Sequence, residues 1–579
     1  MKKERCVKLD LVTRIQQYLE HLYGTETGQD YVPRFRTLAE SYRSRIGPAE
    51  GRRRISEKDV MLITYPDQVQ DGRRPHLRVL SRFAQEHLAG TVNSVHLLPF
   101  FPYSSDDGFS VMDFLNIAPG LGGWEEVEKL SRNYHVMFDF VCNHVSAQGR
   151  WFREYLSGNP EYREFFIECD PDEDLSSVVR PRTSPLLTRF DSAEGEKWIW
   201  TTFSADQVDL NYGNPEVLLR MTDILLSFAE HGARYIRMDA VAYLWKEKGT
   251  SCIHLPRAHT VVKLFRAVLD CAAPGVSLIT ETNVPHRENI QYFGNGHDEA
   301  QLVYQFSLPP LTAHALLANS STRLSEWASA LEMPSDEATF FNFTASHDGV
   351  GVRPAENILS ESEIGYLAEC AQKHGGYVSY RTRSDGSESP YELNINYLSL
   401  LSRPEEDWTR GADRFLVSQG IMLCMPGMPG IYFHSLAGSV NYNKGVEKTG
   451  EFRSINREKC DYTRLSRDLS QPPRSYIYSR YTAMIRARIE EPAFGPYCPF
   501  EILDQGKQVF GLRRRSQCDT HRVTALFSLC EDTLPVQVAF SGDTGSSVKD
   551  IISGNEYPVS EQGTLAIELG PFEMLWLKQ

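Results

Sequence analysis

The sequence lacks any apolar run of the about 20 residues that a membrane-spanning helix needs. Basic charge is also scarce, because 61 Lys and Arg stand against 76 Asp and Glu, which gives a net charge of −15. Nucleic acids and anionic membranes are bound through a basic face, so the composition argues against both as partners. An anionic small molecule would have to be met by a local cluster of arginines.

Paired cysteines and metal-ligand clusters are missing as well. The 11 cysteines are odd in number and scattered without a CxxC pair, and Cys142 and Cys424 lie inside apolar runs. Reduced, mostly buried thiols are typical of a cytoplasmic protein. No His/Cys cluster has zinc spacing, so neither a metal nor a cofactor is expected. Residues 1–24 form an amphipathic helical pattern and not a signal peptide, which also favours the cytoplasm.

What the sequence does contain is a series of short apolar segments that end in carboxylates. They are YIRMDAVAY around Asp239, LITETNVPH around Glu281 and FNFTASHDGVG around Asp348. Buried parallel strands deliver side chains to the rim of a barrel in this way. A retaining glycoside enzyme needs an ionised nucleophile and a protonated acid about 5 Å apart. A third carboxylate can strengthen its hold on the sugar in the transition state. A single such residue is more often a helix cap, so the hypothesis depends on the ordered set.

Strand and helix patterns alternate along most of the chain. Helical patterns at 215–232 and 257–273 separate some of the apolar segments, and this alternation indicates a parallel sheet. Eight strands fit a (β/α)8 TIM barrel, an α/β fold. The expected strands begin at Met61, Val92, His135, Ala233, Val276, Ala300, Thr339 and Ile421.

Two spacings between strands are too long for simple loops, and the pattern changes near residue 490 to short strand-like runs. These features predict seven segments. They are an N-terminal helical extension (1–60), a first barrel part (61–144), an excursion domain B after strand 3 (145–215), a second barrel part (216–348), an inserted loop region between strands 7 and 8 (349–415), a third barrel part (416–489) and a C-terminal antiparallel β-domain (490–579).

A fourth motif lies upstream of the three carboxylates. The segment MFDFVCNHVS places Asp139, Asn143 and His144 at the end of another apolar strand. Taken in order, DFVCNH, RMDAV, ITE and SHD resemble the ordered sequence regions of the α-amylase superfamily of glycoside hydrolases and transglycosylases. Asn143 resembles a calcium-ligand position of many amylases.

This resemblance implies the catalytic roles. It implies that Asp239 is the nucleophile, Glu281 the general acid/base and Asp348 the transition-state stabiliser. Arg237 lies two residues before Asp239, on the same strand face, and would support the nucleophile electrostatically. The resemblance further implies that His144 and His347 hydrogen-bond the glucosyl hydroxyls.

Over nearly the whole chain, the sequence is most similar to the sucrose phosphorylase branch, which generally lacks the calcium ion. Among the segments that carry this resemblance are LLPFFPYSSDDGFSVMDF, WTTFSADQVDLNY, VYQFSLPPL and RSINR. It implies that Asp106 and Phe109 line the glucose pocket and that Phe203 and Gln207 border the acceptor side.

Phosphate and water compete for the covalent glucosyl-enzyme of a phosphorylase, and phosphate wins only if it is held tightly. Arginine suits this task because its planar fork holds two phosphate oxygens. The resemblance implies that Arg180 or Arg182 of the RPR segment and Arg453 of RSINR meet phosphate, with Tyr391 as a further hydrogen-bond donor. Any one of these arginines alone is more often an ion-pairing surface residue.

The segment SESPYELN departs from ordinary sucrose phosphorylases, which carry a fructose-holding aspartate just before the tyrosine. Here Ser389 and Pro390 precede Tyr391, and Glu392 stands where Gln is expected. SPYELN, GVEKTGEFRSINR and TSCIHL resemble the glucosylglycerate phosphorylases. These reversibly convert 2-O-α-glucosylglycerate and phosphate to α-glucose 1-phosphate and glycerate. Because glycerate is itself an anion, one arginine-lined pocket can serve both glycerate and phosphate.

Other functions remain open from the sequence alone. The substrate can instead be sucrose, sucrose 6-phosphate or glucosylglycerol, and an α-glucoside hydrolase or transglucosylase would share the same carboxylates. A noncatalytic carbohydrate-binding relative usually loses one of the three acids, and none is missing here. We expect small-molecule partners only, and a monomer or homodimer.

Overall fold

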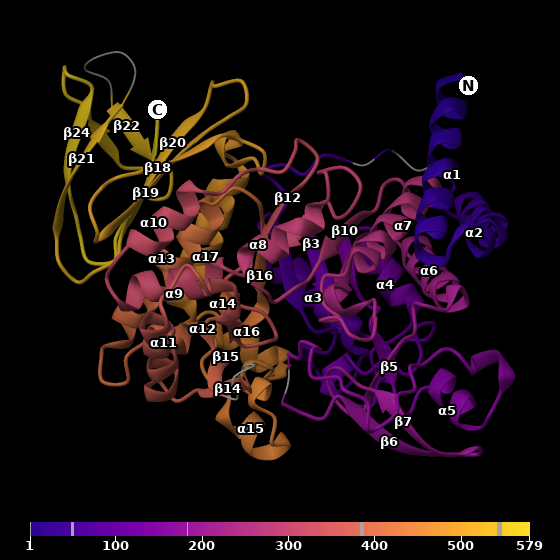
Figure 1. The fold of residues 1–579 in the computed structure, drawn as a ribbon. Coiled ribbons are helices and arrows are strands. Elements are labelled where there is room, and N and C mark those ends of the chain that lie inside the picture. Colours follow the sequence, from indigo (N-terminus) through magenta and orange to yellow (C-terminus); the bar gives the residue numbers. More distant parts are fainter. Residues whose placement is uncertain (1, 48–50, 52, 182, 383–386, 541–546) are drawn as a thin grey trace.

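Eight parallel strands close into a barrel at the centre of the computed structural model (Figure 1). The structure describes residues 2–47, 51, 53–181, 183–382, 387–540 and 547–579. Around the barrel the strand order is β1-β16-β12-β11-β10-β9-β4-β3, and every neighbouring pair is parallel. The strands are β1 (Met61–Thr64), β3 (Ser94–Leu97), β4 (His135–Val141), β9 (Ala233–Asp239), β10 (Ser277–Thr280), β11 (Leu302–Tyr304), β12 (Thr339–Asn342) and β16 (Met428–Tyr432). The predicted TIM barrel is confirmed.

The barrel strands are almost wholly buried, which is why they are continuous apolar runs and not alternating patterns. Helices α6 (Pro215–Glu230) and α7 (Pro256–Ala272) pack against each other, and α6 also packs on β9. Both begin with proline in the first turn, and the Asn214 side chain caps α6 by accepting from the Glu216 N–H. The two helical patterns predicted from the sequence are therefore present.

The eighth strand begins later than predicted. Ile421 to Cys424 form the last turn of helix α13 (Trp408–Cys424), and β16 starts only at Met428. An apolar run cannot by itself distinguish a buried helix from a buried strand. Gly427 makes the sharp turn between them at a φ of +139°. A Cβ there would lie 2.7 Å from the Phe340 carbonyl oxygen, so this close approach requires glycine.

Two helices and a β-domain flank the barrel on opposite sides (Figure 1). Helices α1 (Lys2–Tyr23) and α2 (Thr25–Ile46) pack together and against α7. At the other side, a six-stranded antiparallel sheet has the order β18-β19-β20-β25-β22-β23, and β21 pairs with β24. These strands are β18 (Phe500–Leu503), β19 (Val509–Arg515), β20 (Arg522–Ser528), β21 (Leu534–Ala539), β22 (Ser547–Asp550), β23 (Glu556–Pro558), β24 (Thr564–Leu569) and β25 (Met574–Lys578).

Two further segments carry small sheets of their own beyond the barrel. After β4, strand β5 (His144–Ser146) pairs with β8 (Gln207–Asp209), and β6 (Leu187–Ser192) pairs with β7 (Gly195–Trp200). After β12, strand β13 (Val350–Gly351) pairs with β15 (Glu388–Asn394), which pairs with β14 (Tyr377–Thr382). The predicted division between residues 415 and 416 falls inside α13, and the domain division as a whole stays a prediction.

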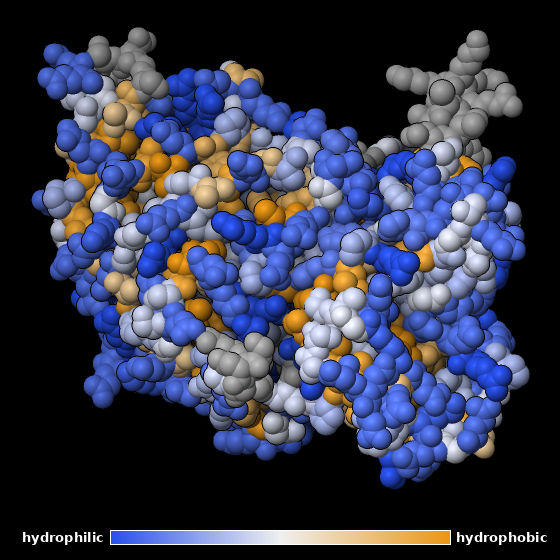
Figure 2. All heavy atoms as spheres, viewed as in Figure 1, coloured by the Kyte–Doolittle hydropathy of each residue, from blue (hydrophilic) through white to orange (hydrophobic). Residues whose placement is uncertain are grey.

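The face of the molecule in Figure 2 is mostly hydrophilic, with hydrophobic areas between the hydrophilic residues. Across the described part of the chain, no helix is both long enough and apolar enough to span a membrane.

Candidate active site

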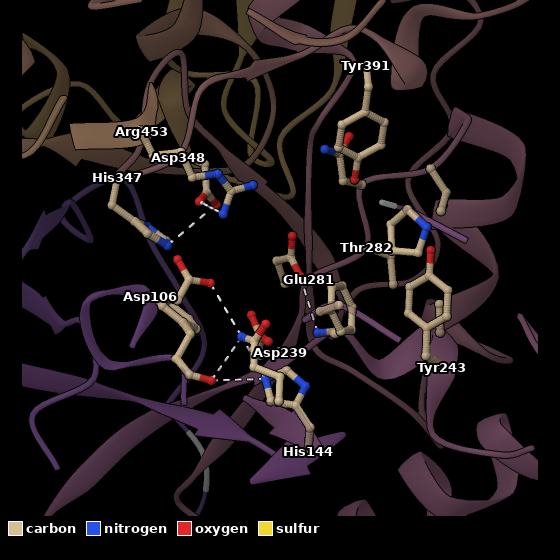
Figure 3. A pocket seen from close by; sticks show the side chains of 18 residues that line it. Asp106, His144, Asp239, Tyr243, Glu281, Thr282, His347, Asp348, Tyr391 and Arg453 are labelled. Carbon is tan, nitrogen blue, oxygen red and sulfur yellow. Dashed lines mark hydrogen bonds and ion pairs between the residues drawn. The ribbon is translucent and has the colours of Figure 1, made fainter. Parts of the chain in front are cut away.

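The three carboxylates singled out in the sequence converge on one pocket (Figure 3). Asp239 is the last residue of β9, Glu281 directly follows β10, and Asp348 lies between β12 and β13. The carboxyl ends of parallel barrel strands meet at one face, so residues far apart in sequence become neighbours there. The space between the lining residues amounts to about 690 Å³ when its opening to solvent is included. The predicted residues that line it are Asp106, Phe109, His144, Phe203, Gln207, Asp239, Glu281, His347, Asp348, Tyr391 and Arg453.

Arg237 connects the carboxylates from beneath the pocket. Its buried guanidinium donates through Nη1 to Asp239 Oδ1 at 2.9 Å and also pairs with Asp139. Its Nη2 lies 3.9 Å from Glu281 Oε2. Arg237 and Asp239 are two residues apart on β9, so both side chains point to the same side of the strand. One fixed cation therefore stabilises the ionised forms of both carboxylates.

The two carboxyl groups differ in how strongly they hold a proton. Burial raises the pKa of Glu281 to about 7, and the nearby charges of Asp239 and Asp348 add to the shift, while Arg237 opposes it. Burial also raises the pKa of Asp239, but the positive charge of Arg237 and, to a lesser extent, its hydrogen bond to the carboxylate oppose this rise. At neutral pH the pair is therefore suited to one ionised and one protonated carboxyl, as acid and nucleophile require.

Aromatic rings and polar side chains form the floor of the pocket beside Asp239. Phe109 stacks on His347 with ring centroids 4.9 Å apart and an interplanar angle of 3°. The His144 ring Nε2 lies 2.9 Å from the Phe109 carbonyl oxygen. Gln207 Nε2 lies 3.4 Å from Asp106 Oδ2, so the excursion after β4 reaches this floor. Flat apolar and polar faces of this kind suit a sugar ring.

Arg457 is a site residue that the sequence argument missed. It donates from Nη1 to Asp107 Oδ2 at 2.7 Å and from Nε to the His347 carbonyl oxygen at 2.9 Å. Its Nη2 lies 3.6 Å from Asp348 Oδ1. Burial lowers the pKa of His347 well below its usual value, and Arg457 adds to this effect, so the ring is neutral. The only sequence signal was the second arginine of RSINR.

Loop residues that follow the strand ends also line the pocket without having been predicted. Tyr243 lies four residues after Asp239, and Thr282 and Asn283 directly follow Glu281. Figure 3 shows Tyr243 and Thr282 together on the side of the pocket away from His347 and Asp106. These residues could have been predicted from the sequence, because they closely follow the predicted carboxylates.

The predicted phosphate-binding arginines differ in position. Arg453 lines the pocket, and its guanidinium contacts Asp348 and Glu392, each at 2.6 Å. Arg180 is not among the lining residues, although its neighbour Pro181 is. The Nε and Nη2 atoms of Arg180 are buried without a hydrogen-bond partner among the described residues. Arg182 lies outside the described residues.

Comparison with known proteins gives the family. The family described as "Alpha amylase, catalytic domain" matches residues 89–349. The chain is 46% identical to the glucosylglycerate phosphorylase of Spirochaeta thermophila, over 98% of this chain and 99% of that one. It is 42% identical to the glucosylglycerate phosphorylase of Escherichia coli strain K12, over 98% of this chain and 100% of that one. The chain belongs to the glucosylglycerate phosphorylase family.

A solved structure supports the barrel fold of this family. It is the sucrose 6F-phosphate phosphorylase from Thermoanaerobacter thermosaccharolyticum, with a TM-score of 0.73 and 24% identity, covering 87% of this chain and 98% of that one. At that identity the likeness shows the fold alone. The predictions of an α-amylase-type barrel and of an enzyme from the phosphorylase branch are confirmed by these relatives.

In this member of the glucosylglycerate phosphorylase family, a lysine lies against the asparagine that resembles a calcium ligand. The Lys246 ammonium is 2.7 Å from Asn143 Oδ1 and 2.7 Å from Asp209 Oδ2. All three side chains are buried, and Asp209 also accepts from the N–H and hydroxyl of Thr202. Among the described residues, no group of three or more His, Cys, Asp or Glu side chains is arranged to hold a metal ion. Lys246 thus supplies the positive charge between Asn143, in the connection from β4 to β5, and Asp209 at the end of β8.

Lys246→Met is expected to destabilise the protein, because it leaves Asp209 as a buried charge without its cationic partner. Breaking a buried pair in this way costs about 3 to 5 kcal/mol. Lys248→Met is the matched control, since Lys248 pairs with Glu173 at an exposed position and should cost at most about 1 kcal/mol. Thermal unfolding of both variants checks the difference, and equal midpoints would contradict the role given to Lys246. Chelator treatment of the wild type should not shift its midpoint.

Proposed function

We propose that this chain is a retaining glucosylglycerate phosphorylase. It would reversibly convert 2-O-α-D-glucosylglycerate and phosphate to α-D-glucose 1-phosphate and D-glycerate. The observation that carries the chemistry is the pair Asp239 and Glu281, both in contact with Arg237 and with their proton affinities set by burial and charge. The near-full-length identity to proteins named glucosylglycerate phosphorylase supports the substrate.

In the first step, Asp239 attacks the anomeric carbon of the bound glucoside. Glu281 gives its proton to the glycosidic oxygen as the bond to glycerate breaks. Positive charge develops on the sugar ring in the transition state, and Asp348 stabilises it across the pocket. Arg237 keeps Asp239 ionised and aimed through its hydrogen bond at 2.9 Å. The product of this step is a covalent glucosyl-enzyme with Glu281 ionised.

In the second step, a phosphate oxygen attacks the same carbon from the side that glycerate has left. Asp239 departs as a carboxylate, Glu281 accepts the proton of the incoming phosphate, and α-glucose 1-phosphate forms with retained configuration. Arg453 and Tyr391 line this side and are proposed to hold the phosphate. Two inversions at one carbon account for retention.

The acceptor side favours a small anion as the leaving group. Glycerate and phosphate must occupy the same space in turn, and Arg453 lies there next to Asp348. In β15, Ser389 and Pro390 stand where a fructose-holding aspartate would come just before Tyr391. Phe203 also lines the pocket, on the acceptor side that the resemblance assigns to it. These contacts support glycerate over fructose.

With glucose 1-phosphate as donor, glycerate is expected to be a better acceptor than glycerol by about tenfold to a hundredfold. Glycerol has the same skeleton without the carboxylate, and a charge-assisted hydrogen bond contributes about 1.5 to 3 kcal/mol. Phosphate release with glycerate, glycerol, fructose and fructose 6-phosphate measures the preference. A faster reaction with glycerol or with either sugar would contradict the substrate but not the phosphorylase mechanism.

Product analysis with and without phosphate distinguishes a phosphorylase from a hydrolase. A phosphorylase releases glucose 1-phosphate from glucosylglycerate only when phosphate is present, whereas a hydrolase releases free glucose at the same rate with or without it.

We also propose a cytoplasmic enzyme that acts as a monomer or homodimer. Among the described side chains ten cysteines are free and most are buried, which supports a reducing compartment.

A further inference from the structure

A carboxylate that the catalytic steps do not use holds Arg453 in place. Glu392 accepts from Arg453 Nε at 2.9 Å through Oε1 and from Nη2 at 2.6 Å through Oε2. This is a bidentate contact along one edge of the guanidinium. Glu392 is 1% exposed, so the contact is shielded from water. In the sequence, Glu392 was the position where glutamine is expected.

The backbone around Glu392 confines its side chain. Glu392 lies in β15, between β14 and β13, and pairs with Ser379 on one side and Gly351 on the other. At Gly349 a Cβ would come 2.7 Å from Glu392 Cγ and 2.5 Å from the Leu393 carbonyl oxygen. Only glycine leaves space there for the glutamate. The sheet therefore confines the Glu392 side chain independently of its contact with Arg453.

The other edge of Arg453 faces the catalytic centre. Its Nη1 lies 2.6 Å from Asp348 Oδ1, and the residue lines the pocket. A guanidinium has five N–H groups, and Glu392 takes two of them, while Asp348 lies at ion-pair distance from Nη1. The remaining hydrogens on Nη1 and Nη2 form the end of the fork. Figure 3 shows Arg453 beside Asp348 and His347 at one wall of the pocket.

Without Glu392, the arginine has an alternative partner at hand. Burial disfavours the charged guanidinium, but the Asp348 and Glu392 carboxylates outweigh it and raise the pKa of Arg453 well above its usual value. If Glu392 did not bind Nε and Nη2 of Arg453, the guanidinium would turn and pair through two nitrogens with Asp348. That pairing would occupy the end of the fork and also neutralise the carboxylate needed in the transition state.

We propose that Glu392 is a positioning residue that keeps Arg453 shared between two carboxylates, so that the end of its fork stays open to the anion in the acceptor subsite. The ligand class is a small carboxylate or phosphate anion. This inference rests on the proposed function, which supplies the anion. Glutamine at position 392 cannot replace glutamate, because its amide NH2 would face an N–H of the arginine.

Glu392→Gln is the variant that tests this role, with Glu388→Gln as its matched control at the exposed start of the same strand. Steady-state rates are measured for phosphate, glycerate and glycerol as acceptors. We expect KM for phosphate and for glycerate to rise at least about tenfold in Glu392→Gln, with a smaller change in kcat. The preference for glycerate over glycerol should fall by a similar factor. Glu388→Gln should behave as the wild type.

A double-mutant cycle with Arg453→Gln shows whether Glu392 acts through the arginine. Glu392→Gln should add little to the loss already caused by Arg453→Gln, because its target is gone. Additive losses would overturn the proposal. So would a lower KM for phosphate in Glu392→Gln, which would mean that Glu392 repels the anion. Equal losses for glycerate and glycerol would point to a structural role and would overturn it as well.

A crystal structure of Glu392→Gln separates this inference from the proposed function. We expect Arg453 to leave residue 392 and to pair through two nitrogens with Asp348. An Arg453 side chain in its original position would overturn the positioning role, whatever the enzyme's substrate. If the wild type forms no glucose 1-phosphate from glucosylglycerate and phosphate, the proposed function fails, while this structural outcome still decides the role of Glu392.

Discussion

Asp239→Asn is expected to reduce kcat by about 10⁴-fold or more while the protein remains folded. The amide is a very weak nucleophile, so the covalent glucosyl-enzyme cannot form at a useful rate. The fold should survive because Arg237 keeps its pairing with the buried Asp139. Steady-state turnover with glucose 1-phosphate and glycerate measures the loss, and circular dichroism checks the fold.

The control for this substitution is Asp336→Asn, the same chemical change at an exposed position outside the pocket. Its kcat should equal that of the wild type. Substantial turnover by Asp239→Asn would rule out Asp239 as the nucleophile. The anomeric configuration of the product, followed by NMR in the wild type, gives an independent check, since a β-configured product would contradict double displacement.

Glu281→Gln is expected to lower kcat/KM by about 10²-fold to 10⁴-fold for glucosylglycerate, because no proton reaches the leaving oxygen. The loss should be much smaller for an activated donor such as α-glucosyl fluoride, whose leaving group departs without protonation. The comparison of the two donors is the measurement. Equal losses with both donors would show that Glu281 is not the general acid.

The same residue sets the pH dependence. With a pKa of about 7, Glu281 is protonated below neutral pH and loses its proton as the pH rises. The wild-type kcat/KM for glucosylglycerate should therefore fall as pH increases through about 7. Burial raises the pKa of Asp239 above its ordinary value, so activity should also fall at acid pH, where the nucleophile is protonated. In Glu281→Gln the alkaline fall should disappear, and a persistent one would assign it to another group.

Much of the fold was predictable because its signals are local. The strand β9 is an apolar run whose alternation puts Arg237 and Asp239 on one side, and helices α6 and α7 carry period and capping signals in their own residues. The predicted start of the eighth strand was wrong because four apolar residues, Ile421 to Cys424, fit a buried helix as well as a buried strand. The resemblance to known motifs supplied the order of the site residues along the chain.

By itself, the sequence determined the barrel, the family and the set of carboxylates from which a catalytic site could be built. Only the tertiary structure decided which charges meet. Glu392 and Arg453 are 61 residues apart, and Arg457 reaches Asp107 across 350 residues. Lys246 meets Asn143 across 103 residues. No local period or spacing in the sequence encodes such pairs. The energy of a buried ion pair depends on the distance between its charges and on the dielectric around them, and both are set only when the strands and insertions have packed.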